Sequence, residues 1–247
     1  MGAEIAVKVD IGGKRYTIVS DDDYLQHISG GFEPEMVWLF RSLVKYKDIV
    51  LDVGANIGCS AILFGDLARA VHAFEPSPTT FKFLQKNIQR SRFKNVELHN
   101  IGLGAEAGEF TLTFSPANRS GGFVSDQTKT GSGSVTETIA IRQMDDVAGS
   151  LNLSGLDFIK IDVEGFEGSV IRGAQQMLST YRPIVVMELN HWCLNAFQRT
   201  SIPDFFDLLR SVFPILHAVD GDHYRDLHDE GDSYGVMYHR LLHQRCP

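Results

Sequence analysis

A glycine-containing segment at residues 52–58, with the sequence Asp-Val-Gly-Ala-Asn-Ile-Gly, constrains this chain more than any other feature. It directly follows an apolar run at 49–51 and precedes a helical pattern at 59–68. Gly54 and Gly58 let the backbone turn sharply and approach a ligand at points where a Cβ would collide. Open α/β sheets bind ligands at the carboxyl ends of their strands. The segment therefore predicts a ligand-binding turn after the first strand of an α/β sheet.

Short apolar runs and amphipathic helical patterns alternate along the chain from residue 48 onward. Strands are expected at 49–53, 71–75, 96–100, 157–162 and 183–188, and helices at 59–68, 77–88, 166–178 and 202–212. This order predicts parallel strands joined by right-handed crossovers. Runs at 214–219 and 235–239 are separated by a link too short for a crossover helix, so we expect them to pair antiparallel. The expected fold class is a doubly wound, seven-stranded, mostly parallel α/β sheet.

Residues 1–47 differ in pattern and are expected to form an extension packed on one domain at 48–247. Alternating runs around Gly12 and Gly13 predict a β-hairpin, and the apolar spacing from Pro34 to Val44 predicts a helix. A second hairpin is expected from 108–114 and 135–141. The segment 115–134 between its strands is rich in Gly, Ser and Thr, which predicts either a disordered loop or a lid over the site.

Charge and composition exclude several classes of partner. The chain has 23 basic and 31 acidic residues, a net charge of −8, which disfavours nucleic acid as the main ligand. No apolar run approaches the roughly 18 residues that span a bilayer, and no secretory leader is visible at the first residues, so we expect no membrane association. Three scattered cysteines fit reduced thiols in the cytoplasm. The oligomeric state stays open.

Glu75 ends the second expected strand, 17 residues after Gly58, where a carboxylate can accept hydrogen bonds from both hydroxyls of a ribose. A dinucleotide site needs glycines at the first, third and sixth positions of the turn. Counted from Gly54, the third and sixth positions hold Asn56 and Cys59 instead. Asp52 also suits the cationic amine and sulfonium of S-adenosylmethionine better than a pyrophosphate. The residues therefore favour methyl transfer over hydride transfer.

Three motifs occur in the order seen in a known family: Leu-Asp-Val-Gly-Ala-Asn-Ile-Gly at 51–58, Phe-Glu-Pro at 74–76 and Ile-Lys-Ile-Asp-Val-Glu-Gly-Phe-Glu at 159–167. They resemble the FkbM family of methyltransferases, which have the class I, Rossmann-like fold. Gly-Phe-Glu-Pro-Glu at 31–35 also resembles the family, as does Gln-Met-Asp-Asp at 143–146, where the family more often has Thr-Leu-Asp. The resemblance covers residues 30 to 190, so it does not identify the substrate.

The resemblance implies S-adenosylmethionine as cofactor and O-methylation of a hydroxyl on a sugar, polyketide or other small natural product. Each part of the cofactor would have its own set of residues. The methionine end would contact Asp52, Gly54, Ala55, Asn56 and Gly58, with Asp162 closing the pocket, the ribose would contact Glu75 and Pro76, and the adenine would lie beside Asn100, Ile101 and Gly102.

Candidates for the chemistry follow the fourth and fifth strands. His191 is a possible general base, because its ordinary pKa suits proton transfer at neutral pH, although a loop-packing role is equally open. Asp162, Glu164 and Glu188 could orient the hydroxyl, act as base, or hold a divalent cation with Asn190. Asp162 and Glu164 could instead bond backbone amides and cap the next helix, which is the role we expect for Glu167. We expect no metal requirement. A nitrogen or protein acceptor, and a non-catalytic cofactor-binding module, remain alternatives.

Overall fold

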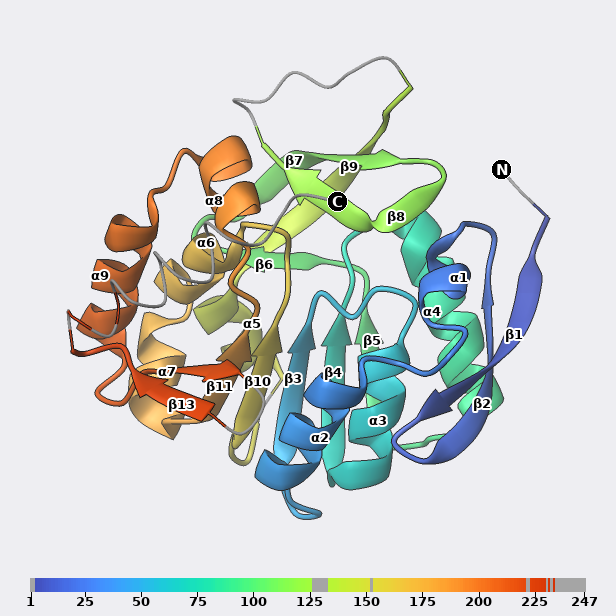
Figure 1. Ribbon diagram of the computed structural model, residues 1–247, viewed down its shortest axis with the longest axis horizontal. Coiled ribbons are helices and arrows are strands. Elements are labelled where there is room, and N and C mark those ends of the chain that lie inside the picture. The colour runs from blue at the N-terminus through green and yellow to red at the C-terminus, as the bar shows by residue number, and fades with distance from the viewer. Residues whose placement is uncertain are drawn as a thin grey trace.

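The computed structural model describes residues 3–125, 133–151, 153–220, 223–229, 231 and 233. Its centre is a parallel sheet in the order β11-β10-β3-β4-β5 (Figure 1). The strands are β3 (Ile49–Val53), β4 (Ala70–Phe74), β5 (Val96–His99), β10 (Phe158–Ile161) and β11 (Ile184–Met187). Every residue of β3 and of β10 is buried, which explains their continuous apolar character. All five strands lie where the sequence predicts them.

The seven-stranded sheet is not observed in the described part of the chain. The last antiparallel pair consists of β12 (His217–Asp220) and β13 (His223–Asp226), which form a separate two-stranded sheet. In the described residues, β12 thus pairs with a strand that begins at 223, where Asp220 lies opposite His223. The strand expected at 235–239 lies outside the described residues.

Helices cover both faces of the central sheet, and each face has its own apolar core. One core joins the sheet to α2 (Pro34–Leu43), α3 (Cys59–Leu67) and α4 (Pro78–Ser91), and its centre is the aromatic trio Phe40, Phe64 and Phe158. The other joins the sheet to α6 (Glu167–Arg172), α7 (Gln175–Tyr181) and α9 (Ile202–Val212). The helix expected at 166–178 is therefore two helices. They break where Gly173 packs so close that a Cβ would lie 1.9 Å from the Gly104 carbonyl oxygen.

The expected N-terminal hairpin is present as β1 (Ile5–Ile11) and β2 (Lys14–Ser20), and it is followed by α1 (Tyr24–His27). Gly12 and Gly13 form its turn at φ 63° and 83°. Val9 and Ile18 belong to the same buried cluster as Val50 of the central sheet. The hairpin is also tied to α4, because the buried Asn87 amide accepts from the Val19 N–H at 2.8 Å and donates to the Val19 carbonyl at 3.1 Å.

A second sheet lies above the carboxyl ends of the central strands (Figure 1). This cap sheet contains β6 (Gly102–Gly104), β7 (Gly108–Ser115), β8 (Asn118–Val124) and β9 (Val135–Gln143), in the order β6-β9-β7-β8. The antiparallel pairing of β7 with β9 confirms that these two runs pair, but β8 lies between them in sequence and pairs with the other edge of β7, so they are not a simple hairpin. The prediction of an irregular loop from 115 is wrong at 118–124, where β8 forms, whereas 126–132 lie outside the described residues.

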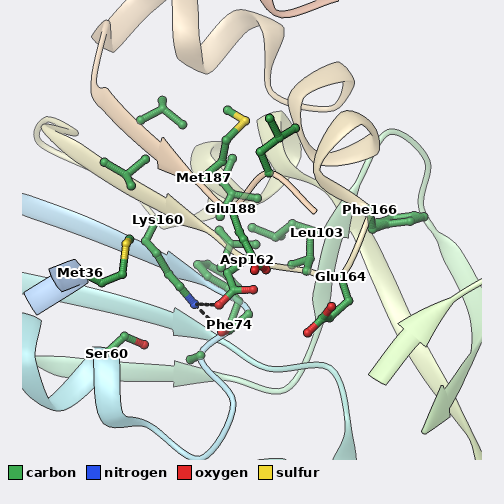
Figure 2. A pocket seen from close by; sticks show the side chains of 18 of the residues that line it. Met36, Ser60, Phe74, Leu103, Lys160, Asp162, Glu164, Phe166, Met187 and Glu188 are labelled. Carbon is green, nitrogen blue, oxygen red and sulfur yellow. Dashed lines mark hydrogen bonds and ion pairs between the residues drawn. The ribbon is translucent and has the colours of Figure 1, made fainter. Parts of the chain in front are cut away.

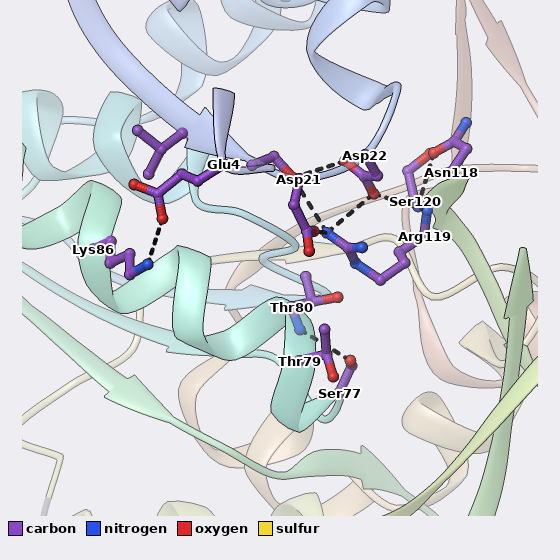
Figure 3. A network of polar contacts seen from close by, with 12 residues as sticks. Glu4, Asp21, Asp22, Ser77, Thr79, Thr80, Lys86, Asn118, Arg119 and Ser120 are labelled. Atoms are coloured by element: carbon purple, nitrogen blue, oxygen red, sulfur yellow. Dashed lines mark hydrogen bonds and ion pairs between the residues drawn. The ribbon is translucent and has the colours of Figure 1, made fainter. Parts of the chain in front are cut away.

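Arg119 explains why β8 is ordered despite its weak pattern. Its guanidinium is buried and donates to Asp21 at 2.6 Å and to the Ser20 hydroxyl at 3.2 Å, while Asp22 lies 3.3 Å away (Figure 3). Its backbone N–H donates to Asp22 at 3.1 Å. The cap sheet is thereby fixed to the segment that follows the N-terminal hairpin. Two further helices, α5 (Met144–Ser150) and α8 (His191–Gln198), follow β9 and β11.

No helix in the described part of the chain has both the length and the apolarity needed to cross a membrane.

Candidate active site

A cavity lies between the cap sheet and the carboxyl ends of the central strands. Its floor includes residues of the turns after β3, β4, β10 and β11, and its roof includes apolar side chains of the cap sheet. The lining includes Gly54, Ala55, Asn56, Glu75, Pro76, Lys160, Asp162, Glu164 and Glu188 on the floor, and Gly102, Leu112, Phe114, Ile139 and Ile141 from the cap sheet. Most of the residues expected at the cofactor site therefore line one cavity.

The glycines of the turn after β3 are required by contacts within the protein itself. Gly54 has φ +80°, and a Cβ on it would lie 1.9 Å from the carbonyl oxygen of Asp162. Gly58 has φ +101°, and its Cβ would lie 2.7 Å from Cδ1 of Leu84 in α4. Gly58 itself lies behind the cavity wall. The sequence identified both positions, but it attributed them to a ligand rather than to neighbouring chain.

Glu75 connects the turn after β3 to the turn after β4. It is only 8% exposed, and its carboxylate accepts from the Asn56 N–H at 3.0 Å and from the Ser77 N–H at 2.9 Å. Burial raises the pKa of Glu75 to about 7, against the opposing effect of these two hydrogen bonds. A carboxylate has about four lone-pair positions, so the two that remain can accept from a ligand in the cavity.

If Glu75 holds a ribose as the sequence predicts, its replacement by alanine should weaken the binding of S-adenosylhomocysteine about 100-fold, through the loss of two charge-assisted hydrogen bonds. Isothermal titration calorimetry measures the affinity. Glu137→Ala is the matched control, since Glu137 accepts from Ser77 and Thr79 without lining the cavity. A folded Glu75→Ala protein with the affinity of the control would contradict the ribose role.

The adenine residues are only partly placed as expected. Gly102 lines the cavity, whereas Asn100 and Ile101 lie outside its lining as far as the structure is described. The Asn100 amide instead donates to the carbonyl oxygens of Glu75 and Pro76, at 2.8 and 3.1 Å. Asn100 therefore holds the turn after β4 in position rather than contacting the cavity directly.

Asp52 does not lie where the sequence predicts it. It is completely buried beneath the cavity wall, where Ser60 donates to it at 2.7 Å and Lys160 Nζ lies 3.5 Å from Oδ1. Burial raises the pKa of Asp52, and Lys160 opposes that shift. Asp52 is therefore outside the described cavity lining, and its carboxylate faces Ser60 and Lys160 instead.

Lys160 is a residue of the site that was not expected from the sequence. Its ammonium donates to the Gly54 carbonyl at 2.7 Å and lies 3.3 Å from Asp162 Oδ2 (Figure 2). Burial alone would lower its pKa, but the charges of Asp162 and Asp52 raise it above the ordinary value. Lys160 is therefore a permanent cation that links β10 to the turn after β3. The available signal was a lysine inside the otherwise apolar strand Phe-Ile-Lys-Ile.

Asp162, Glu164 and Glu188 converge at the ends of β10 and β11, as the sequence predicts. One carboxylate oxygen from each lies within 4.8 Å of the other two (Figure 2). Glu164 has φ 52° and accepts from Cys193 Sγ at 3.3 Å. Burial raises the pKa of Glu188, and the negative charges of Asp162 and Glu164 raise it further, to about 8. Since Glu188 is exposed to the cavity, we attribute the shift mainly to these like charges and to the hydrogen bond it shares with Asp162.

Glu33 also belongs to the cavity wall, and the sequence analysis gave it no role. It precedes α2 with the unusual φ of 29°. Burial and then the charge of Asp162 raise its pKa. Its position places the Gly-Phe-Glu-Pro-Glu segment at 31–35 beside the acidic cluster.

His191 and Asn190 do not join the acidic cluster. His191 is the first residue of α8, and its side chain lies outside the cavity lining in the described structure. Asn190 caps this helix, with its side-chain oxygen accepting from the Cys193 N–H at 3.1 Å. The sequence predicts only that His191 follows the fifth strand, whereas in the structure it begins helix α8.

Glu167 bonds backbone amides as expected, but these belong to the turn before α6, and no side chain caps the helix itself. It is 1% exposed, and its carboxylate accepts from the Val163 and Gly165 N–H groups at 3.1 and 3.2 Å. These bonds fix the turn that carries Asp162 and Glu164. Burial raises the pKa of Glu167 to about 7.

The free energy of unfolding should fall as the pH rises from about 4.5 to about 7. The folded pKa values of Glu75 and Glu167 are about 7, above the ordinary 4.5, so the folded protein keeps protons that the unfolded chain releases in this window. Urea unfolding at a series of pH values measures the slope. Glu167→Gln should make the slope shallower, and an unchanged slope in that variant would contradict the assignment.

Comparisons with known proteins identify the family of the chain. A model of the methyltransferase FkbM domain matches residues 52–226. The hexuronic acid methyltransferase AglP of Haloferax volcanii is 28% identical over 70% of this chain and 69% of its own length. The 31-O-demethyl-FK506 methyltransferase FkbM of Streptomyces tacrolimicus is 29% identical over 52% of this chain and 60% of its own length.

A crystal structure of methyltransferase FkbM from Methylobacillus flagellatus shares the fold, with a TM-score of 0.50 and 21% identity over 75% of this chain. The present chain covers only 44% of that protein. It therefore spans less than half of the solved relative, and 60–69% of the two curated ones. Since the domain model matches well over half of its residues, the chain belongs to the FkbM family of methyltransferases.

Proposed function

We propose that this protein transfers the methyl group of S-adenosylmethionine to a hydroxyl of a small molecule. The observation that carries the proposal is the convergence of Asp162, Glu164 and Glu188 in the cavity that also contains Glu75 and the Gly54 turn. A group that can bind a ribose and a group that can take up a proton thus face the same space. Such a pairing fits a nucleoside-bearing donor next to a protic acceptor.

The donor site suits S-adenosylmethionine in both its parts. The free lone pairs of Glu75 fit the ribose hydroxyls, and the carboxylates of Asp162 and Glu164 fit the positive charge of the amine and sulfonium. Ala55, Asn56 and Pro76 form the walls between these two regions. When bound, the cofactor supplies an electrophilic methyl group.

The chain's own residues would orient the acceptor and remove its proton. Lys160 Nζ lies 3.3 Å from Asp162 Oδ2, and Glu188 shares a hydrogen bond with Asp162. With a pKa of about 8, Glu188 can lose its proton near neutral pH and then accept the hydroxyl proton. Correct orientation of the two reactants contributes the larger part, about 7–11 kcal/mol of the barrier.

The acceptor class follows from the cavity walls and from the relatives. The apolar roof formed by Leu112, Phe114, Ile139 and Ile141 suits a compact organic molecule. The two curated relatives are described as acting on a hexuronic acid and on 31-O-demethyl-FK506. We therefore propose a sugar or a polyketide as the acceptor.

Incubation with methyl-labelled S-adenosylmethionine and a panel of acceptors tests the proposal. The panel contains sugars with and without a carboxylate, a macrolide, an amine and a peptide, and mass spectrometry locates the label. We expect label on an oxygen of a sugar or macrolide. Label on nitrogen or on the peptide would contradict the acceptor class, and cofactor binding without turnover on any acceptor would indicate a non-catalytic module.

We also retain the division into an extension at 1–47 and a domain at 48–247 as a proposal. The shared core of Val9, Ile18 and Val50 supports an extension that folds together with the domain rather than separately from it.

A further inference from the structure

Two histidines and a glutamate gather at the opposite side of Phe74 from the cavity. His72 lies on β4, and Glu97 and His99 lie on β5, the edge strand of the central sheet. The parallel register pairs His72 with Glu97 and Phe74 with His99. Because side chains two residues apart on a strand share a face, all three project from the same face of the sheet. They lie outside the cavity lining.

The spacing of their ligand atoms is that of a metal site. His72 Nδ1 lies 3.3 Å from His99 Nε2 and 3.5 Å from Glu97 Oε2, and His99 Nε2 lies 4.0 Å from Glu97 Oε1. Two nitrogens bound to one tetrahedral Zn²⁺ at about 2.0–2.1 Å are about 3.4 Å apart. The two imidazoles are therefore already separated by the edge length of a tetrahedral site, without any movement of the backbone.

The surroundings hold both rings in a form that can bind a cation. The His99 ring stacks on Phe74 at 4.6 Å and on His72 at 5.5 Å. The side chains of His99 and His72 are only 16% and 12% exposed, whereas that of Glu97 is 63% exposed. Burial lowers the pKa of both histidines. Neutral rings keep a nitrogen lone pair, which is the form that ligates metals.

We propose that His72, Glu97 and His99 bind a single Zn²⁺ ion or a similar late first-row divalent cation. Two imidazoles and one carboxylate favour such ions over Mg²⁺ or Ca²⁺, which prefer oxygen ligands. Three protein ligands leave a fourth position for water, on the exposed side of Glu97. The ion ties edge strand β5 to β4, one residue before Glu75, whose N–H donates to the His99 carbonyl at 3.1 Å. The site is distinct from the acidic cluster, and its existence does not depend on the methyl-transfer proposal.

Cobalt substitution provides the test. The full chain, without an affinity tag and stripped of metal, is titrated with Co²⁺, whose visible absorption is intense in tetrahedral sites and weak in octahedral ones. Competition with Zn²⁺ then gives the zinc affinity. We expect an intense 1:1 Co²⁺ spectrum that Zn²⁺ abolishes, together with a higher thermal unfolding midpoint in the presence of Zn²⁺.

Variants separate this site from others on the chain. His99→Ala and His72→Ala should each weaken zinc binding at least about tenfold and remove the intense spectrum. His27→Ala is the matched control, because His27 is an exposed histidine on α1. Glu188→Gln, in the acidic cluster, should also leave the spectrum intact. Circular dichroism of each variant verifies that it is folded, and Glu97→Gln is a milder variant should a histidine replacement fail to fold.

The proposal is overturned if Co²⁺ gives only a weak octahedral spectrum, or if the intense spectrum survives in folded His72→Ala and His99→Ala. Loss of the spectrum in Glu188→Gln but not in these variants would place the metal in the acidic cluster instead, and would also overturn it.

Discussion

Replacement of Glu188 by glutamine should lower kcat by about 10²–10⁴, the usual contribution of a general base. Glutamine keeps the size of the side chain and can still donate a hydrogen bond to Asp162, but it cannot accept the hydroxyl proton. The affinity for S-adenosylhomocysteine should stay unchanged, because in the proposed site Glu188 faces the acceptor rather than the ribose. In the parent protein, kcat should rise with pH through the Glu188 pKa of about 8, and the variant should lose that rise.

Steady-state kinetics on the acceptor identified by methyl labelling measures this effect, and calorimetry measures cofactor affinity. Glu109→Gln, at an exposed position on β7, is the matched control. His191→Ala should retain most activity, because His191 lies outside the cavity lining. If Glu188→Gln has normal kcat while His191→Ala is inactive, the histidine is the base and the proposed assignment is wrong.

Replacement of Gly54 by alanine should lower the free energy of unfolding by more than about 4 kcal/mol. The new Cβ would lie 1.9 Å from the Asp162 carbonyl oxygen, so the turns after β3 and β10 would have to separate. The backbone would also carry a side chain at φ +80°. Displacement of Asp162 should abolish cofactor binding in any variant protein that still folds.

The Gly13→Ala variant separates the effect of the clash with Asp162 from the effect of a side chain at positive φ. Gly13 has φ +83°, nearly the same as Gly54, but no atom lies within 4 Å of the point that a Cβ on it would occupy. The Gly13→Ala variant should therefore lower the free energy of unfolding only by the cost of a side chain at positive φ, about 1–3 kcal/mol. Urea unfolding of both variants measures the difference. Equal destabilisation would show that the approach of Asp162 is not the cause.

The central strands were predictable because burial on both faces leaves a continuous apolar signature, as in β3 and β10. Strand β8 was not, because its order depends on Arg119 pairing with Asp21 and Asp22, about a hundred residues away in the chain. The split between α6 and α7 likewise depends on the close approach of Gly173 to Gly104. Long-range contacts of this kind leave no local periodicity.

For the site, the sequence located Glu75 and the acidic cluster because both follow predicted strands at one edge of the sheet. It assigned Asp52 to the ligand, since the pattern gave no reason to expect Lys160 beside it. It also treated His191 as following a strand without a helix, although Asn190 stands in the position of a helix cap. Ion pairs between strands, unlike positions along a strand, cannot be deduced from spacing.

The pairing of Arg119 with Asp21 and Asp22 has a consequence for protein engineering. Ion pairs join strand β8 of the cap sheet to the segment after β2, although the two lie far apart in the sequence. A chimera that imports a foreign cap sheet to change acceptor preference must import the matching residues 20–22 as well. Without them, a guanidinium or two carboxylates would be left enclosed and uncompensated.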